Sequence, residues 1–366
     1  MARTFLPEIN FLRGLACLGV LIVHVSATYY YKNGQVWDEA IIFLNQIGRF
    51  GTPAFAVLSG FLLFYPYFQK PFFLSRFTRS KLVKIVSPFM VWGLFYFALS
   101  QWIHPSSLQL SFSQIVKLFG LGQSFYHLYF MSLVIQFYAV FPLLQRWLTT
   151  SLRWWVALGG ALIVNTVLLL LRADHLDGLA QAVLLEKAIL PSWIFYFIFG
   201  GFIAFHWERL SHHLRAYAWS YLVIGLLLIL GAMLEYQHFG IYTSKRLSNL
   251  VNIPLLSLAV FALFSLIKES GWIVRSVMEI GSRGFGIYLI HPLVLFLAGE
   301  VLPAPWWHPN LFGAVYVLIL VGSILLVKAI QTLPFSQYLL TVPKDPRSSH
   351  TPHTRIPDSA SVTVFK

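Results

Sequence analysis

Long apolar segments recur along the whole chain, and short polar segments separate them. Ten runs stand out, at about 11–30, 43–65, 85–102, 124–146, 154–171, 188–206, 217–236, 250–267, 283–300 and 311–329. A membrane-spanning helix needs about 20 mostly apolar residues, and most of these runs approach that length. None alternates apolar and polar residues as the strands of a transmembrane barrel do. The pattern therefore predicts an all-α, polytopic membrane protein, a bundle of about ten transmembrane helices.

Lysine and arginine are distributed unevenly between alternate loops. If the N-terminus is cytoplasmic, the cytoplasmic segments carry more than twice as many of these residues as the outer segments. Such an excess marks the side that stays in the cytoplasm, so both termini are predicted there. The segment from residue 342 is polar and rich in Pro and Ser. We therefore expect a transmembrane domain over 1–341 and a disordered cytoplasmic tail over 342–366.

Composition supports a multi-pass protein of the cell membrane. The 366 residues are 58% hydrophobic and 11% charged, whereas soluble domains carry about 25% charged residues. The net charge of +13 would suggest a nucleic-acid partner in a soluble protein. Here we expect no nucleic acid, but a basic membrane face that suits an anionic ligand. Because the only cysteine is Cys17 and no His or Cys pair in the runs has zinc-ligand spacing, neither an intrachain disulfide nor a metal is expected.

The first apolar run contains a stretch that begins with a cation, Arg13, and ends with an imidazole, His24. Between them an α-helix turns through about 1,100°, or three turns plus about 20°, and rises roughly 16 Å. The two side chains therefore share one face. Ionisable groups at membrane depth rarely face lipid and usually line a bundle interior or a wet cavity. A topogenic arginine and a histidine bonded to a neighbouring helix are the alternative, but the shared face favours a function, with His24 as a general base.

A basic segment, FFLSRFTRSKLVKIVSPF, lies between the second and third runs. If it is helical, Arg76 and Arg79 share one face, and so do Lys81 and Lys84. These four cations could enforce topology, bind anionic lipid, or hold the phosphates of a nucleotide-bearing donor. Charge alone does not separate these interpretations.

Other polar residues in the runs are candidates for contact with a substrate. His291 precedes Pro292, where it could also satisfy freed backbone groups. His127 lies near the predicted outer surface, where an extracytoplasmic substrate would enter. Glu235 and Glu300 lie at the predicted outer ends of their helices, where they could orient a hydroxyl-rich acceptor or simply be solvated.

Five segments in order resemble the membrane-bound acyltransferase type 3 family. EINFLRGLACLGVLIVH resembles its opening helix, where Arg or Lys is followed by ten residues and then His, matched by Arg13 and His24. The other four are RFGTPAFAVLSGFLLF, SRFTRSKLVKIVSPF, YHLYFMSLVIQFYAVFPLL and GFGIYLIHPLVL. The family's basic segment reads Arg-x-x-Arg shortly before a proline. Lys81 and Lys84 match it by distance to Pro88, and Arg76 and Arg79 match it by residue type.

This resemblance, closest to exopolysaccharide-associated members such as poly-N-acetylglucosamine export or modification proteins, implies an enzyme. It implies that an acyl group, usually acetyl, moves from cytoplasmic acyl-CoA to a hydroxyl of an extracytoplasmic polysaccharide or lipid-linked glycan. His24 and Arg13 would be catalytic, and the basic segment would bind coenzyme A. The expected partners are membrane lipid, the glycan acceptor and a glycan synthase complex.

Two other functions are compatible with the same residues. An exporter of a polysaccharide or lipid-linked sugar would use the polar interior as a path, without acyl transfer. A structural subunit of a synthase complex would not need His24 at all.

Overall fold

The apolar runs fold as helices. The computed structural model describes residues 6–105, 111–171, 177–178, 181, 184, 186–240 and 243–341. Each of the predicted runs contains a helix, and the described residues include no strand. The tail expected over 342–366 lies outside the described residues, so that expectation stays a prediction.

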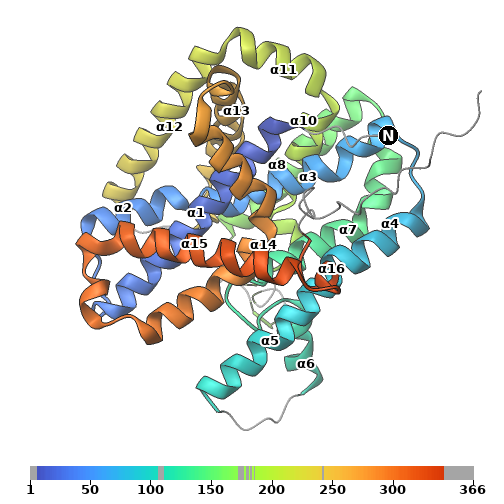
Figure 1. Cartoon of the computed structure of the whole chain (residues 1–366). Helices are drawn as coiled ribbons and strands as arrows, with labels where there is room; N and C mark the ends of the chain where they lie inside the picture. The colour runs from blue at the N-terminus through green and yellow to red at the C-terminus, as the bar shows by residue number, and fades with distance from the viewer. Residues whose placement is uncertain are drawn as a thin grey trace, which may run out of the picture.

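The described chain forms the helices that are labelled in Figure 1. They are α1 (Pro7–Lys32), α2 (Glu39–Gly48), α3 (Gly51–Gln69), α4 (Leu74–Lys81), α5 (Ser87–Ile103), α6 (Phe112–Ile115), α7 (Tyr129–Trp147), α8 (Ser151–Leu170), α10 (Ile194–Phe205), α11 (Trp207–Ala216), α12 (Ala218–Phe239), α13 (Asn249–Ile267), α14 (Gly271–Val301), α15 (Phe312–Gln331) and α16 (Ser336–Leu339). Two π-helical segments, η1 (Leu82–Val86) and η2 (Val116–Gly120), continue α4 and α6. The described chain is thus entirely helix and connecting segments.

Eight helical segments in the described chain are long and apolar enough to cross a membrane. They are Pro7–Lys32, Glu39–Gln69, Leu74–Ile103, Ser151–Leu170, Ala218–Phe239, Asn249–Ile267, Gly271–Val301 and Pro309–Gln331. Two predicted spans are not in this set. The 12 residues of α10 rise only about 18 Å, less than a hydrocarbon core of about 30 Å. The 19 residues of α7 include Gln136 and Arg146. The class of polytopic, all-helical membrane protein is confirmed, while the side on which the termini lie stays a prediction.

The first and the longest helix form the centre of the bundle. Within their most apolar stretches, 56% of α1 and 50% of α14 are buried inside the protein, against 11% of α12. Figure 1 shows α1 and α14 in the interior and α12 along an edge. Because polar groups at membrane depth are tolerated where protein surrounds them, this centre is where a site is expected.

Glycine allows α1 and α14 to approach closely. A Cβ atom on Gly281 would lie 2.0 Å from the main-chain oxygen of Asn10, and one on Gly14 would lie 2.1 Å from that of Val277. Small residues at such crossings let two backbones touch, the usual basis of helix association in membranes. The two helices run parallel, since Asn10 lies against Gly281 and, further along, His24 lies against His291.

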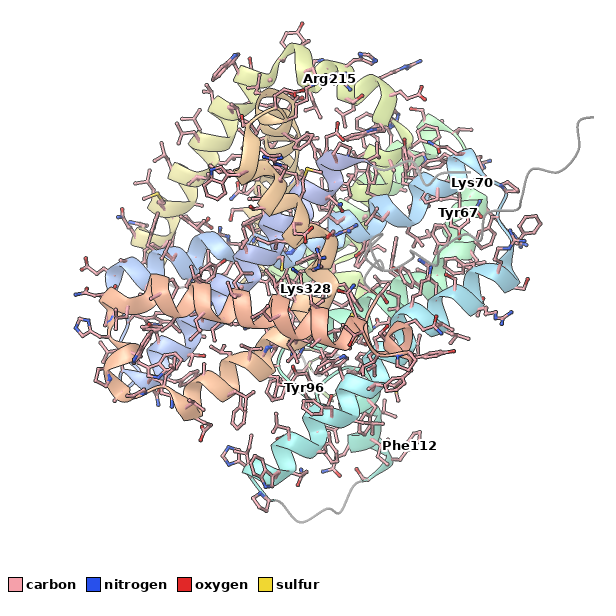
Figure 2. The ribbon with its side chains drawn as sticks, viewed as in Figure 1. Tyr67, Lys70, Tyr96, Phe112, Arg215 and Lys328 are labelled. Carbon is pink, nitrogen blue, oxygen red and sulfur yellow. The ribbon has the colours of Figure 1, made fainter. Side chains whose placement is uncertain are left out.

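One buried hydrogen bond fixes α5 to α14. Tyr96 on α5 has no exposed surface (Figure 2), and its hydroxyl donates to the main-chain oxygen of Leu289 at 2.6 Å. By contrast, Phe112 on α6 is 82% exposed at the edge of the molecule (Figure 2). The inner face of α5 is therefore held against the central pair, which sets the position of the basic segment that precedes it.

Candidate functional site

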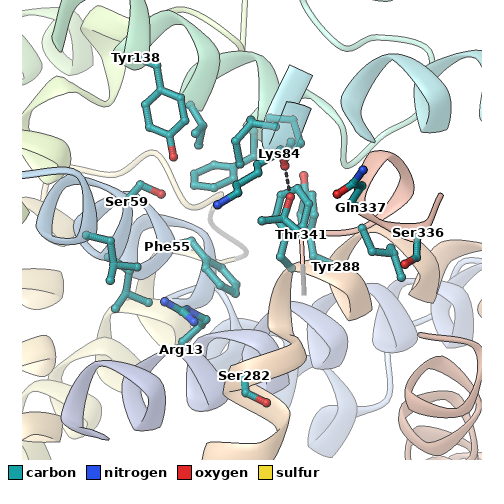
Figure 3. A pocket seen from close by; sticks show the side chains of 18 of the residues that line it. Arg13, Phe55, Ser59, Lys84, Tyr138, Ser282, Tyr288, Ser336, Gln337 and Thr341 are labelled. Atoms are coloured by element: carbon teal, nitrogen blue, oxygen red, sulfur yellow. Dashed lines mark hydrogen bonds between the residues drawn. The ribbon is translucent and has the colours of Figure 1, made fainter. Parts of the chain in front are cut away.

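A cavity of about 410 Å³ lies between α1, α3, α7, α14, the basic segment and the C-terminal part of the described chain. Its apolar lining comes mainly from α3 and α7. Its polar lining consists of Arg13, Ser59, Lys84, Tyr138, Ser282, Tyr288, Gln331, Ser336, Gln337 and Thr341. Figure 3 shows Arg13 and Lys84 approaching this space from different walls. The volume and the mixed lining are typical of small-molecule sites.

Arg13 lies inside the bundle, as its place on α1 predicts. Its Nη1 donates to Asn10 Oδ1 at 3.0 Å, one turn earlier on the same helix. Gly284 on α14 faces it, and a Cβ atom there would already touch the Arg13 side chain at 3.4 Å. Arg13 therefore lines the cavity where α14 leaves room for a long side chain, and its charge is available to an anionic ligand.

The structure separates the four cations of the basic segment. Lys84, in η1, lines the cavity, and Lys81 places its Nζ 4.2 Å from the ring centroid of Tyr138, another lining residue. Arg76 is exposed, with its guanidinium 5.4 Å from the ring centroid of Phe73, and Arg79 is also exposed. Of these four cations only Lys84, which is itself exposed, lines the cavity, and Lys81 contacts the lining residue Tyr138. These two lysines are the pair that matches the family pattern by distance to the proline. The role of either pair in donor binding stays a prediction.

Three histidines meet at the other end of the central pair. The ring centroids of His24 and His291 are 5.1 Å apart, and those of His127 and His291 are 5.7 Å apart. The ring of Tyr126 lies 4.8 Å from that of His24. We refer to His24, His127 and His291 as the imidazole cluster. Sequence reasoning singled out each member separately, but not their contact.

The ring nitrogens of the cluster are sparsely bonded. His291 Nδ1 donates to the main-chain oxygen of Ile287 at 3.0 Å, one turn earlier on the same helix. Its Nε2 and both ring nitrogens of His127 are buried without a hydrogen-bond partner. Buried polar atoms are normally paired, so these nitrogens are positioned to accept or donate a proton when a substrate group enters.

The cavity and the imidazole cluster are adjacent but separate. A void too narrow to hold a water molecule lies between them, lined by Cys17, Val20, Leu21, Phe55, Ile287, Tyr288 and His291. Phe55 and Tyr288 line both the cavity and this void, so their side chains form the partition. Along α1 the order is Arg13, then the void, then His24. Movement of this partition would join the two spaces.

The two candidate carboxylates are not brought to either space. Both carboxylate oxygens of Glu235 lie 2.9 Å from Ser248 Oγ and share its single hydroxyl hydrogen, and Glu235 also forms an ion pair with Arg246 at 3.4 Å. Glu300 is exposed at the end of α14. Neither lines the cavity, so their contact with a substrate stays a prediction that this geometry does not support.

Arg49 is a candidate that sequence reasoning missed. Its Nε donates to Asn45 Oδ1 at 3.0 Å, and Asn45 Nδ2 donates to Ser26 Oγ at 2.8 Å. Asn45 is 1% exposed, so this relay ties Arg49 to the turn of α1 that follows His24. The signal in the sequence was Asn45 in the last turn of α2 and Arg49 directly after its end.

Among the residues that the structure describes, no three His, Cys, Asp or Glu side chains are grouped so as to hold a metal ion. The rings of the imidazole cluster contact one another in tilted and edge-on orientations.

The fold and the site together define the class of protein. It is a multi-pass helical membrane protein with a cationic cavity beside a buried imidazole cluster. The family described as "Acyltransferase domain" matches residues 6–328, nearly the whole chain. The chain belongs to this family.

The chain is similar to curated proteins whose names describe export of a polysaccharide. It is 25% identical over 301 residues to a probable poly-beta-1,6-N-acetyl-D-glucosamine export protein of Staphylococcus aureus (strain MRSA252), covering 79% of this chain and 82% of that protein. It is 27% identical over 302 residues to a protein of the same description from Staphylococcus epidermidis, covering 79% and 81%. No solved structure matches the chain.

Proposed function

We propose that this protein is a membrane-bound O-acyltransferase. In this proposal an acyl group, acetyl in the first instance, moves from cytoplasmic acyl-CoA to a hydroxyl of an extracytoplasmic polysaccharide or lipid-linked glycan. The observation that carries it is the arrangement along α1, with Arg13 in a cationic cavity, a narrow void next, and His24 in the imidazole cluster. Membership of the acyltransferase-domain family supports it.

The cavity is the proposed donor site. Arg13 and Lys84 would face the anionic groups of coenzyme A, and the rest of the lining would face the thioester arm. The axial rise from Arg13 to His24 is roughly 16 Å, about half the hydrocarbon thickness of a bilayer of roughly 30 Å. Once the side chains of Phe55 and Tyr288 move apart, a thioester arm that extends from the cavity along α1 would bring its acyl carbon to the imidazoles, and no acyl carrier would need to cross the membrane.

The proposed chemistry is a single transfer with a histidine as base. The acceptor hydroxyl oxygen attacks the thioester carbonyl carbon, its proton passes to the His24 imidazole, and the carbonyl π electrons move to oxygen. The intermediate then re-forms the carbonyl and breaks the carbon–sulfur bond, and the imidazolium returns its proton to the departing thiolate. The products are an ester and a free thiol. Arg49, bonded through Asn45 to Ser26 of α1, would supply positive charge that stabilises the developing oxyanion.

The acceptor would contact the other members of the imidazole cluster. His127 and His291 have unpaired, buried ring nitrogens that suit sugar hydroxyls. For Glu235 and Glu300, contact with the acceptor stays a prediction. The names of the staphylococcal proteins make a poly-N-acetylglucosamine-type glycan the first acceptor to test, and membrane lipid and a glycan synthase complex remain the expected surroundings.

The test of the proposal is mass analysis of surface glycans from cells with and without the protein. Loss of one class of ester on deletion, restored by the wild-type chain, is the expected result. Unchanged esterification would count against acyl transfer.

Export without chemistry is the second candidate, because the printed names of the similar proteins describe export. An exporter should leave glycan esterification untouched and should accumulate unexported glycan when it is removed. It should also tolerate loss of the His24 imidazole, whereas an enzyme should not.

Lys84→Ala tests which basic pair holds the donor. Because Lys84 lines the cavity and Arg76 is exposed beside Phe73, we expect the dissociation constant for coenzyme A to rise about ten- to hundredfold in Lys84→Ala. The matched control, Arg76→Ala, should change it by less than about twofold. Calorimetry on the purified protein measures both, and equal losses would contradict the assignment to the lysine pair.

Phe55→Ala tests the partition between the cavity and the imidazole cluster. Removing this ring should widen the passage, so we expect the ratio of butyryl to acetyl transfer to rise by at least about tenfold, as an enlarged apolar pocket allows. Competition between the two acyl-CoA donors measures the ratio, with exposed Phe112→Ala as control. An unchanged ratio in an active Phe55→Ala protein would place the acyl group elsewhere.

A further inference from the structure

One wall of the cavity comes from residues beyond the family match. That match ends at residue 328, yet Gln331, Ser336, Gln337, Leu340 and Thr341 all line the cavity. Figure 3 shows Ser336, Gln337 and Thr341 on the side away from Arg13 and Ser59. We call residues 336–341 the C-terminal wall. The lining around Lys84 is therefore completed by a segment that lies beyond the residues matched to the family.

The C-terminal wall is anchored to the start of α5 by side-chain hydrogen bonds. Ser87 Oγ donates to the main-chain oxygen of Tyr338 at 3.1 Å, and Trp92 Nε1 donates to that of Leu339 at 3.0 Å. Ser336 and Leu340 are 5% and 3% exposed. A segment held at successive residues has a defined position, which a binding wall requires.

Thr341 supplies a third anchor. The hydroxyl of Thr341 donates to the Lys84 main-chain oxygen (Figure 3). This bond couples the C-terminal wall to the residue proposed to hold the donor's charge.

The wall differs chemically from the rest of the lining. Arg13 and Lys84 supply positive charge, and the α3 and α7 surfaces are apolar, with Leu58 and Val134 as examples. The wall instead offers a neutral hydroxyl and a carboxamide, from Ser336 and Gln337. A carboxamide donates and accepts at once, so it complements another amide better than it complements a phosphate or a hydrocarbon chain.

We propose that the C-terminal wall is the part of the donor site that recognises the neutral, amide-bearing arm of a thioester donor. Gln337 and Ser336 would hydrogen-bond the arm's secondary amides, and Arg13 and Lys84 would hold its anionic end. This inference rests on the proposed function, since it assigns a further part of the same donor site. It makes residues 336–341 specificity-determining for the donor.

Binding of coenzyme A and of its two halves separates the parts of the site. The probes are coenzyme A, pantetheine (the amide-bearing arm without the nucleotide) and adenosine 3′,5′-bisphosphate (phosphates without the arm), titrated into the purified full-length protein. In Gln337→Ala and Ser336→Ala we expect affinity for coenzyme A and for pantetheine to fall about three- to tenfold each, as for the loss of one hydrogen bond. Affinity for the bisphosphate should not change. Lys84→Ala should lower the affinity for coenzyme A and for the bisphosphate and should leave the affinity for pantetheine unchanged.

Controls keep a folding defect apart from a binding defect. Gln114→Ala removes an exposed carboxamide on α6, which does not line the cavity, and should change none of the three affinities. Thr341→Val removes one anchor and should weaken pantetheine binding while the bisphosphate still binds. Unaltered pantetheine affinity in both Gln337→Ala and Ser336→Ala, or equal loss for all probes, would overturn the wall's role. Failure of the unsubstituted protein to bind coenzyme A would overturn the proposed donor itself, and the wall's role with it.

Discussion

His24→Ala is expected to abolish acyl transfer while the protein still folds and still binds coenzyme A. A positioned general base contributes about 10²–10⁴-fold to a rate, so transfer should fall by at least about a hundredfold. Donor affinity should change little, because His24 does not line the cavity that holds the charged groups. Mass analysis of glycan esters in cells, together with coenzyme A titration of the purified variant, measures both quantities.

The matched control is His212→Ala on α11, an exposed histidine outside the imidazole cluster. It should leave esterification and donor binding unchanged. If His24→Ala cells retain normal glycan esters at normal expression, the base is not His24, and the exporter and subunit hypotheses gain ground. If His24→Ala loses donor binding as well, the residue acts in the donor site and not as a separate base.

Gly200→Ala is expected to disrupt the bundle. Its Cβ atom would lie 1.9 Å from the main-chain oxygen of Val57 on α3, and across the same crossing a Cβ on Gly60 would lie 2.0 Å from that of Phe197. No side-chain rotation relieves a clash with backbone, so α3 and α10 must separate. Overpacking of this kind costs about 1–3 kcal/mol and occasionally more. Thermal unfolding and the monodisperse fraction in detergent report the loss.

Gly159→Ala on α8 is the control of identical chemistry. A Cβ atom there meets nothing within 4 Å. Replacing a helical glycine by alanine in open space stabilises a helix by roughly 0.5–1 kcal/mol, so the two variants should shift the unfolding temperature in opposite directions. Equal small shifts would mean that the α3–α10 crossing is looser than described.

The class of protein was predictable because apolar periodicity depends on local sequence. Every predicted run contains a helix, since about 20 apolar residues in lipid can satisfy their backbone groups only internally. Span boundaries were less predictable. The run at 188–206 looked long enough to cross, but its helix α10 begins only at Ile194, after the turn at Leu190–Ser192. Hydropathy does not register such a turn, because Pro191 lies in an otherwise apolar stretch.

Within the site, single-helix geometry could be worked out from spacing, whereas contacts between helices could not. Arg13 and His24 share a face of α1 by arithmetic alone. The choice between the arginine pair and the lysine pair needed the path of η1, which brings Lys84 to the cavity while Arg76 faces outward. The importance of Arg49 likewise depends on its bond to Asn45.

The sequence by itself determined that the chain is a helical membrane protein, that Arg13 and His24 share one helix face, and that five segments resemble one family. These are properties of short windows, set by periodicity and hydrophobicity. Only the tertiary structure decided that three histidines meet, that Phe55 and Tyr288 separate them from the cavity, and that residues 336–341 complete its lining. The reason is physical. These contacts join helices far apart in the chain, and close backbone packing at glycines such as Gly281 sets their distances.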